Sequence, residues 1–400
     1  MTAKRRKDQQ GRAGAGPVFL GGASPVPLAH FGGAMSNETA KPKIHIDFRT
    51  FFILILVAVI PMLVGTWWLF RSFEDAYLDR TGADLSGIAD TAFVAVNNYL
   101  QNQIMETAAL TEVPVLREVV SRSNQDLGRD LNEVRKAIPR TETAWASMAL
   151  QSPKAREILE NSAADFLRRY IAVNKSYRQV IITDFLGRLV AATEKPSRYY
   201  WALDEWWREA YGDGSRGAVF IGNVRYDGNN SSYIMDMAQP IISADGSITG
   251  MIRVILDTQP IHALIGSIQS DPGMSVALIH ARGDIISAPG YSSLEFRTYP
   301  ATLDILNARD RERRSFISTG EPRSVYGLSQ RGFTEIFPHL NWIVVASTSV
   351  KGLLEPLTQL RNYFIALLLG IFLATFVATL MLSRVESKPI IEEDPHLERL

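Results

Sequence analysis

The residues best suited to chemistry are a group of aromatic side chains followed by aspartates. Trp201, Trp206 and Trp207 lie close together in the sequence, and further tyrosines and aspartates precede the apolar stretch that begins at Pro240. Aromatic rings supply contact area and a few charged groups supply orientation, which is what a pocket for a small molecule needs. The sequence therefore predicts a ligand-binding site. Its predicted residues are Tyr199, Trp201, Trp206, Trp207, Tyr226, Asp227, Tyr233 and Asp236.

Charges of both signs accompany these rings, so the residues alone leave the sign of the ligand's charge open. An alternative is that the rings cap the edge of a sheet and that the charges are solvated or paired within the fold. The candidate partners of an anion are Arg198, Arg225 and Arg253, and those of a cation are Asp204, Asp227 and Asp236.

Signals of catalysis are weak along the chain. The sequence has no cysteine, which excludes a thiolate metal site and a cysteine nucleophile. His262, His280 and His339 lack the i, i+3 or i+4 spacing of a metal site. The sequence contains no nucleophile elbow, P-loop or dinucleotide-binding fingerprint. It therefore predicts no enzyme, metal or cofactor, and a hydrolase that uses Asp227 or Asp236 is the remaining catalytic alternative.

Composition excludes overall disorder and gives no sign of a nucleic-acid partner. Apolar residues make up 46% of the chain, which is ordinary for a folded protein. The 42 basic residues are balanced by 42 acidic ones. The basic run at 309–314 (RDRERR) contains interleaved acids, which predicts a solvated helix face and not a nucleic-acid contact.

Two apolar segments are long enough to anchor the chain in a membrane. Residues 51–70 and 363–382 contain no charge, and each is close to the roughly 20 residues that a helix needs to cross a bilayer. The sequence predicts transmembrane helices at 50–70 and 362–383. A cleaved signal peptide is the alternative for the first segment, but this run is longer than a signal-peptide core and starts far from the N-terminus.

Flanking charges predict the orientation of the two spans. The segment 1–49 is rich in lysine and arginine, which favours the cytoplasmic side, and its composition predicts disorder. Two spans then place both termini in the cytoplasm and residues 71–361 outside. The tail, 384–400, is expected to be short and cytoplasmic.

The outside region reads as a mixture of helices and strands. A helical pattern runs from Arg71 to about Ala137 and another covers 152–174. Strand–turn–strand patterns follow at 179–193, 238–257 and 275–289, and a buried-type strand at 341–347 leads to a helix at 350–361. Gly283 takes the place in the third pattern that Gly187 takes in the first. The sequence therefore predicts an α+β fold with a long N-terminal helix and two tandem β-units.

This order of elements resembles the double Cache family. The resemblance rests on a long helix followed by IITDFLGRLVAAT, DEWWREAY, MAQPIISADGSITGMIRVILD, ALIHARGDIISAPG and NWIVVASTSVKGLLEPLTQLRNYF. It implies an extracytoplasmic ligand sensor of a bacterial inner membrane, built from two PAS-like antiparallel units. The membrane-distal unit would span about 140–260 and the membrane-proximal unit about 261–350. The ligand is expected in the distal unit, between the WW helix and the sheet.

The amino-acid-binding branch of that family carries a characteristic set of residues. Tyr199 and Trp206 fit the set, and Tyr226–Asp227 approximates its Tyr/Asp pair. Asp204 stands at the position of the arginine that grips an α-carboxylate, and Ile255 stands at the position of the late aspartate. These departures disfavour an amino acid as the ligand.

Together these patterns predict a membrane-bound, extracytoplasmic small-molecule sensor. Because the tail is too short for a kinase or cyclase, we expect the signal to pass to a separate protein such as a kinase or a chemoreceptor. The apolar stripe of the long helix permits a homodimer. The alternative is a structural or assembly membrane protein that uses the Cache-like domain to dock another protein.

Overall fold

The chain divides into two compact units, Met1–Leu54 and Ile55–Leu400, and each is described by itself. In the first unit only the start of a helix is described. The predicted segment 1–49 and tail 384–400 therefore lie almost wholly outside the described residues. The computed structural model describes residues 48–127, 131–212, 214, 217–228, 231–268, 273–291, 298–337 and 339–385.

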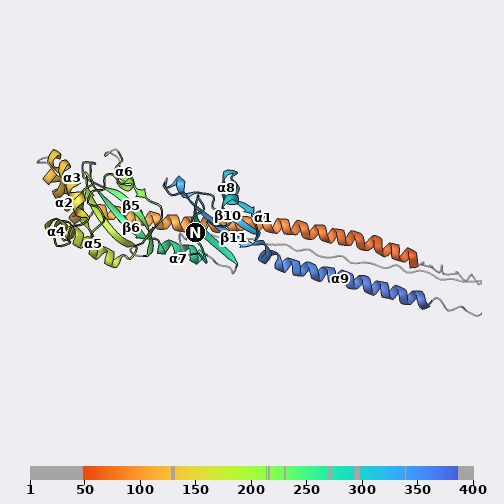
Figure 1. Ribbon diagram of the computed structural model, residues 1–400. Coiled ribbons are helices and arrows are strands. Elements are labelled where there is room, and N and C mark those ends of the chain that lie inside the picture. The colour runs from red at the N-terminus through yellow and green to blue at the C-terminus, as the bar shows by residue number, and fades with distance from the viewer. Residues whose placement is uncertain are drawn as a thin grey trace, which may run out of the picture. The chain divides into compact units, whose positions relative to one another are not determined.

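Before the first strand, the described residues form five helices. They are α1 (Phe48–Thr111), α2 (Pro114–Leu127), α3 (Leu131–Trp145), α4 (Pro153–Leu159) and α5 (Ser162–Val173) (Figure 1). The helix predicted from Arg71 to about Ala137 is therefore divided among α1, α2 and α3, with the first break just before Pro114. A proline fits the first turn of a new helix because its missing N–H needs no partner there.

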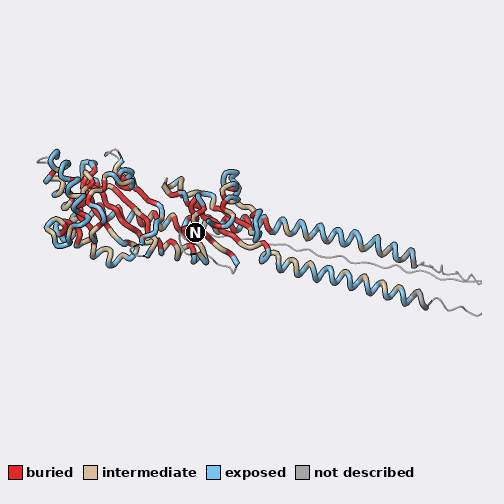
Figure 2. The backbone as a smooth tube through the Cα atoms, viewed as in Figure 1, coloured by how far each residue is buried: buried red, intermediate tan, exposed pale blue. Residues whose placement is uncertain are grey.

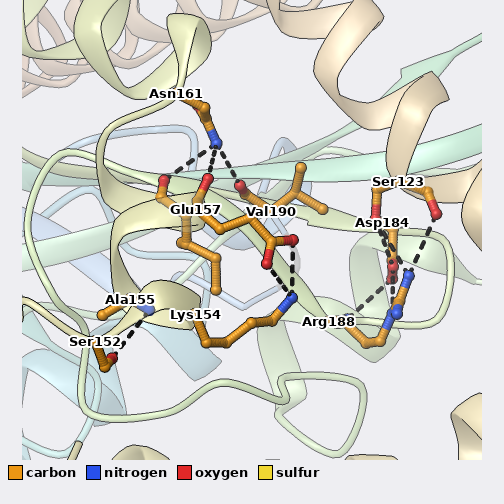
Figure 3. A network of polar contacts seen from close by, with 10 residues as sticks. Ser123, Ser152, Lys154, Ala155, Glu157, Asn161, Asp184, Arg188 and Val190 are labelled. Atoms are coloured by element: carbon orange, nitrogen blue, oxygen red, sulfur yellow. Dashed lines mark hydrogen bonds and ion pairs between the residues drawn. The ribbon is translucent and has the colours of Figure 1, made fainter.

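The helix predicted at 152–174 is divided because two side chains cap new helix starts. Ser152 accepts a hydrogen bond from the backbone N–H of Ala155 at 3.3 Å and begins α4. Asn161 accepts one from Ala164 at 2.9 Å and begins α5. Its amide also donates to the carbonyl of Val190 at 2.9 Å, which ties the break between the two helices to the first sheet (Figure 3).

The first sheet has six antiparallel strands in the order β2-β1-β6-β5-β3, with β4 beside β5. A tight turn joins β5 and β6 at Asp245–Gly246, as the Asp-Gly pair predicts. Helix α6 (Glu205–Tyr211) lies between β2 and β3 in the chain. The strands are β1 (Tyr177–Asp184), β2 (Leu189–Ala192), β3 (Phe220–Ile221), β4 (Arg225–Asp227), β5 (Ser232–Ile242) and β6 (Ile248–Asp257).

The second sheet has five antiparallel strands in the order β8-β7-β11-β10-β9, which repeats the order of the first. The α+β class and the two tandem antiparallel units are thus confirmed. The strands are β7 (Met274–His280), β8 (Ile285–Ser287), β9 (Ser315–Ile317), β10 (Ser324–Leu328) and β11 (Trp342–Ser349). The accompanying helices are α7 (Gln259–Ile268), α8 (Thr302–Asp310) and the short 3-10 helix η1 (Phe333–Glu335).

The duplication extends to single hydrogen bonds. Gly187 and Gly283 both adopt a positive φ, +84° and +96°, in the turn after the first strand of each sheet. The carbonyl of Gly187 accepts from the N–H of Trp201 at 2.8 Å, and that of Gly283 accepts from Tyr299 at 2.9 Å. Each unit therefore places one aromatic residue at the same backbone position, just before α6 or α8.

Helix α1 packs against both sheets. Its buried face shares one apolar core with Val254 of the first sheet and Val344 of the second. Gln239 of the first sheet donates to the carbonyl of Ile104 at 2.8 Å. Ser86 of α1 donates to the carbonyl of Arg314, beside the second sheet, at 2.7 Å. The predicted apolar stripe thus lies largely within the domain's own core.

Two helices are long and apolar enough to cross a membrane. They lie within Ile55–Thr111 and Val350–Met381, and the most apolar window of each has no buried residue (Figure 2). The second belongs to α9 (Val350–Val385), which directly follows β11. Glu74 of α1 lies 3.9 Å from Arg361 of α9. By length and composition these helices agree with the two predicted spans.

One buried histidine makes stability depend on pH. His280 ends β7, and its Nδ1 accepts a hydrogen bond from the N–H of Arg282 at 3.1 Å. Burial, and then the positive charge of Arg282, lowers the pKa of His280. Because the folded chain favours neutral imidazole, its free energy of unfolding should fall as the pH drops through about 6.5, the ordinary pKa of histidine.

Urea unfolding of the wild type and of His280→Asn at several pH values from about 8 to about 5 checks this expectation. Asparagine accepts the same hydrogen bond but does not titrate, so this variant should lose less stability on acidification. His339→Asn is the control, because the His339 side chain is 36% exposed. Equal pH slopes for the wild type and His280→Asn would contradict the prediction.

Candidate functional site

Four of the eight predicted site residues come together in a second apolar cluster. Tyr199, Trp201, Trp206 and Trp207 are buried there with Trp145. The backbone hydrogen bond from Trp201 to Gly187 fixes one indole, and α6 carries the next two. Burial raises the pKa of Tyr199 to about 12, so its phenol stays neutral. The predicted aromatic group is therefore a real spatial cluster on the α6 side of the first sheet.

A buried ion pair supports the turn that holds Trp201. Arg188 Nε lies 2.6 Å from Asp184 Oδ2, and the Asp184 side chain has no solvent exposure. Ser123 of α2 contacts both partners, as Figure 3 shows. Two backbone N–H groups of the same turn, those of Leu186 and Arg188, also donate to Asp184 at 3.0 Å. This network fixes the β1–β2 turn and hence the position of Trp201.

The three indoles differ in their hydrogen bonding. Trp207 Nε1 donates to Thr183 Oγ1 at 3.1 Å, and its ring stacks on Tyr211 at 4.4 Å. Trp201 and Trp206 pack against each other with ring centroids 5.8 Å apart. Their Nε1 atoms are buried and have no hydrogen-bond partner among the described residues. Trp207 is thus satisfied by the fold, whereas the other two donors are left for an acceptor from outside it.

Arg253 of β6 brings a charge to these two indoles. Its guanidinium carbon lies 5.1 Å from the ring centre of Trp201 and 5.3 Å from that of Trp206. Its side chain is only 8% exposed, and Nη2 donates to Asp236 Oδ1 at 2.8 Å. Its Nε is buried with no partner among the described residues. Sequence reasoning named Arg253 as one of several anion candidates but did not include it in the site.

Three buried N–H groups, on two indoles and the guanidinium that contacts them, therefore have no acceptor in the described part of the chain. They belong to Trp201, Trp206 and Arg253. Leaving a buried donor unpaired costs about 1–3 kcal/mol, and more for a charged group. Carbonyl and carboxylate oxygens accept hydrogen bonds and a carboxylate also matches the charge. This arrangement suits a small anion or a molecule that carries a carboxylate.

Asp236 lies beside Arg253, but its carboxylate already has hydrogen-bond partners. Arg225 donates to both of its oxygens at 3.2 Å, in addition to the bond from Arg253. Two guanidinium groups on one carboxylate leave a net positive charge. Asp204, at the start of α6, is paired with Arg198. The geometry therefore favours an anion over a cation here.

Tyr226 and Tyr233 are not brought to the indoles. They face each other across the β4–β5 pair, with ring centroids 5.1 Å apart, and Tyr226 is 52% exposed. Side chains alternate between the two faces of a strand, so Tyr233 and Asp236 point to opposite faces of β5. Asp227 lies opposite Ser232 on the same hairpin. A role for these three residues in binding stays a prediction.

A cavity of about 520 Å³ borders the aromatic cluster. This volume lies in the range of small-molecule sites. Trp207 and Tyr211 of α6 line one side, and Arg135 of α3 lines another. No group of three or more potential metal-binding side chains occurs in the part of the chain that the structure describes. Of the predicted aromatic group only Trp207 lines this cavity, and the donors of Trp201, Trp206 and Arg253 lie outside its lining.

Comparisons with known proteins give structural matches alone. No protein family model and no curated protein matches the chain. The sensory domain of the Campylobacter jejuni chemoreceptor Tlp3 is 13% identical, with a TM-score of 0.46, over 70% of this chain and 98% of that domain. The ligand-binding domain of the Pseudomonas fluorescens chemoreceptor CtaA with L-isoleucine is 12% identical, with a TM-score of 0.40, over 71% and 97%.

The fold agrees with the arrangement that the sequence resemblance implies. It has the long N-terminal helix, the two tandem sheets of equal strand order and the two apolar helices that the sequence resemblance implies. The element order, the two sheets and the two apolar helices are therefore as expected. The predicted limits of the two units, about 140–260 and 261–350, stay predictions.

The prediction that disfavoured an amino acid is contradicted. Tlp3 structures contain L-norvaline, isoleucine or L-valine, and CtaA structures contain L-isoleucine or L-leucine. That prediction rested on single positions, chiefly on Asp204 at the place of the arginine that grips an α-carboxylate. In the fold, however, a guanidinium reaches the aromatic cluster from another element, β6, through Arg253. Position 204 alone therefore excludes no carboxylate ligand.

Proposed function

We propose that the chain is a membrane-anchored sensor whose first sheet binds a small molecule through a carboxylate. The observation that carries this proposal is the set of three buried, unpaired N–H donors around Arg253. The carboxylate would accept from these donors, and the rings of Trp201 and Trp206 would contact the rest of the ligand. Amino acids and simple organic acids belong to this class.

We infer that the sensor domain lies outside the cytoplasm of a bacterial cell. The two apolar helices would cross the inner membrane, and residues 71–361 would face the periplasm. The basic composition of 1–49 supports a cytoplasmic N-terminus.

Signal transfer would use α1 and α9. Both helices leave the folded domain, and their apolar surfaces are unburied. A change in the sheets would move α1 relative to α9, and a separate membrane protein would sense the shift. A ligand can drive this shift only through its different affinity for the two arrangements.

Binding to the full-length protein in lipid nanodiscs tests the proposal. The probes are acetate, L-lactate, L-valine and L-isoleucine, each paired with its methyl ester or amide of similar shape. At least one free acid should raise the melting temperature, because a ligand at about 100 times its Kd adds about 2.7 kcal/mol. Its ester or amide, which lacks the carboxylate, should have little effect.

Equal stabilisation by acid and ester, or none by any of the acids, would contradict the proposed chemistry. A protein that bound none of these probes but copurified stoichiometrically with one membrane protein would support the docking alternative.

A further inference from the structure

We propose that the second sheet holds its own binding site, for a small organic cation. A cavity of about 690 Å³ lies between α8 and this sheet. Its volume is in the range of small-molecule sites. None of its lining residues belongs to the carboxylate site of the first sheet.

The floor of this cavity is a row of hydroxyl groups across three strands. Ser275 of β7 lies opposite Ser347 of β11, which in turn lies opposite Tyr326 of β10. The next row on the same face is apolar, with Ala277 opposite Val345. Polar side chains thus interrupt the core face of the sheet at the cavity, which provides hydrogen-bonding groups for a ligand.

The wall of the cavity repeats a feature of the first unit. Tyr299 occupies the backbone position that Trp201 occupies there, since each donates to the carbonyl of the turn glycine. The Tyr299 hydroxyl lies 3.3 Å from Ser347 Oγ. Tyr291 and Tyr326 also line the cavity. Aromatic rings in such a position offer contact area and attract cations to their faces.

Charge decides the class of ligand. The charged side chains among the described lining residues are Asp304 and Glu321, and neither forms an ion pair with a described residue. Asp304 is oriented by the N–H of Thr319 at 3.2 Å. Burial raises the pKa of Tyr326, and the charge of Asp304 adds to this shift. Two carboxylates that form no ion pair with a described residue, in a cavity lined by aromatic rings, favour a positively charged ligand.

Binding of choline to the full-length protein in lipid nanodiscs tests this proposal. Its neutral isostere, 3,3-dimethyl-1-butanol, has the same shape without the charge. The wild type should bind choline measurably by calorimetry and the isostere at least about tenfold more weakly, a difference of about 1.4 kcal/mol. This comparison uses only the wild-type protein, so its result does not depend on whether any variant folds.

Two variants locate the site. Asp304→Asn combined with Glu321→Gln should weaken choline binding at least about tenfold, and Glu321→Gln alone should weaken it less. Arg253→Gln should leave choline binding unchanged, because it changes the first sheet only. Equal binding of choline and its isostere, no binding of choline, or a loss caused by Arg253→Gln but not by the acidic variants would overturn the proposal.

Discussion

Arg253→Gln should strongly weaken carboxylate binding to the first sheet while the domain stays folded. Glutamine is too short to replace the bond from Arg253 Nη2 to Asp236, but Arg225 continues to neutralise that carboxylate. What is lost is the charge beside Trp201 and Trp206 and the unpaired Nε donor. A hydrogen bond to a charged group contributes about 1.5–3 kcal/mol. Losing the one that Arg253 would donate should weaken binding about tenfold to a hundredfold.

Calorimetry with the acid that stabilises the wild type measures this effect, and circular dichroism checks the fold. Arg225→Gln is the matched control. Arg225 also contacts Asp236, but its side chain is 45% exposed and it has no ring contact with the indoles. It should change the affinity by less than about tenfold. Unchanged affinity in Arg253→Gln would remove the carboxylate site from the proposed function.

Gly327→Val should be the most destabilising single change outside the site. Gly327 lies on β10, against α1, and an added Cβ would lie 2.3 Å from the backbone nitrogen of Ser86. Backbone atoms of a packed helix cannot move aside as a flexible side chain can. Overpacking a core typically costs about 1–3 kcal/mol, and a clash with the helix backbone should exceed this range.

Chemical denaturation of the wild type and the variant measures the loss. Gly266→Ala is the matched control, because Gly266 lies within α7 and an added Cβ meets no atom within 4 Å. Alanine should be neutral there or stabilise the helix by up to about 1 kcal/mol. If Gly327→Val were as stable as the wild type, the close packing of α1 on the second sheet would be wrong.

The strand framework could be predicted from the sequence because its signals are local. Gly187 and Gly283 fix two turns through a backbone conformation that favours glycine, and Asp245–Gly246 fixes a third. The division of the predicted helix at 152–174 was missed. Asn161 caps α5 through a local bond from Ala164, but its second bond, to the carbonyl of Val190, forms only in the folded sheet.

The site was also predictable in part, where its signals are local in the sequence. The aromatic group is contiguous in sequence, so its type and spacing indicate a cluster. The importance of Arg253 depends on strand pairing: β6 lies between β1 and β5, and this places its guanidinium next to Asp236 and beneath two indoles. No local pattern distinguishes this arginine from Arg225. The prediction against an amino acid rested on Asp204 and Ile255 alone, and the sequence did not indicate that Arg253 reaches the aromatic cluster from β6.

The packing of α1 against both sheets has a thermodynamic consequence. Ligands in the two units would act on one shared helix, so their binding free energies are coupled through it. Linkage makes such coupling reciprocal: if a carboxylate in the first unit changes the Kd of a cation in the second by some factor, the cation changes the Kd of the carboxylate by the same factor. The position of α1 would then depend on both concentrations jointly, and neither ligand alone would determine it.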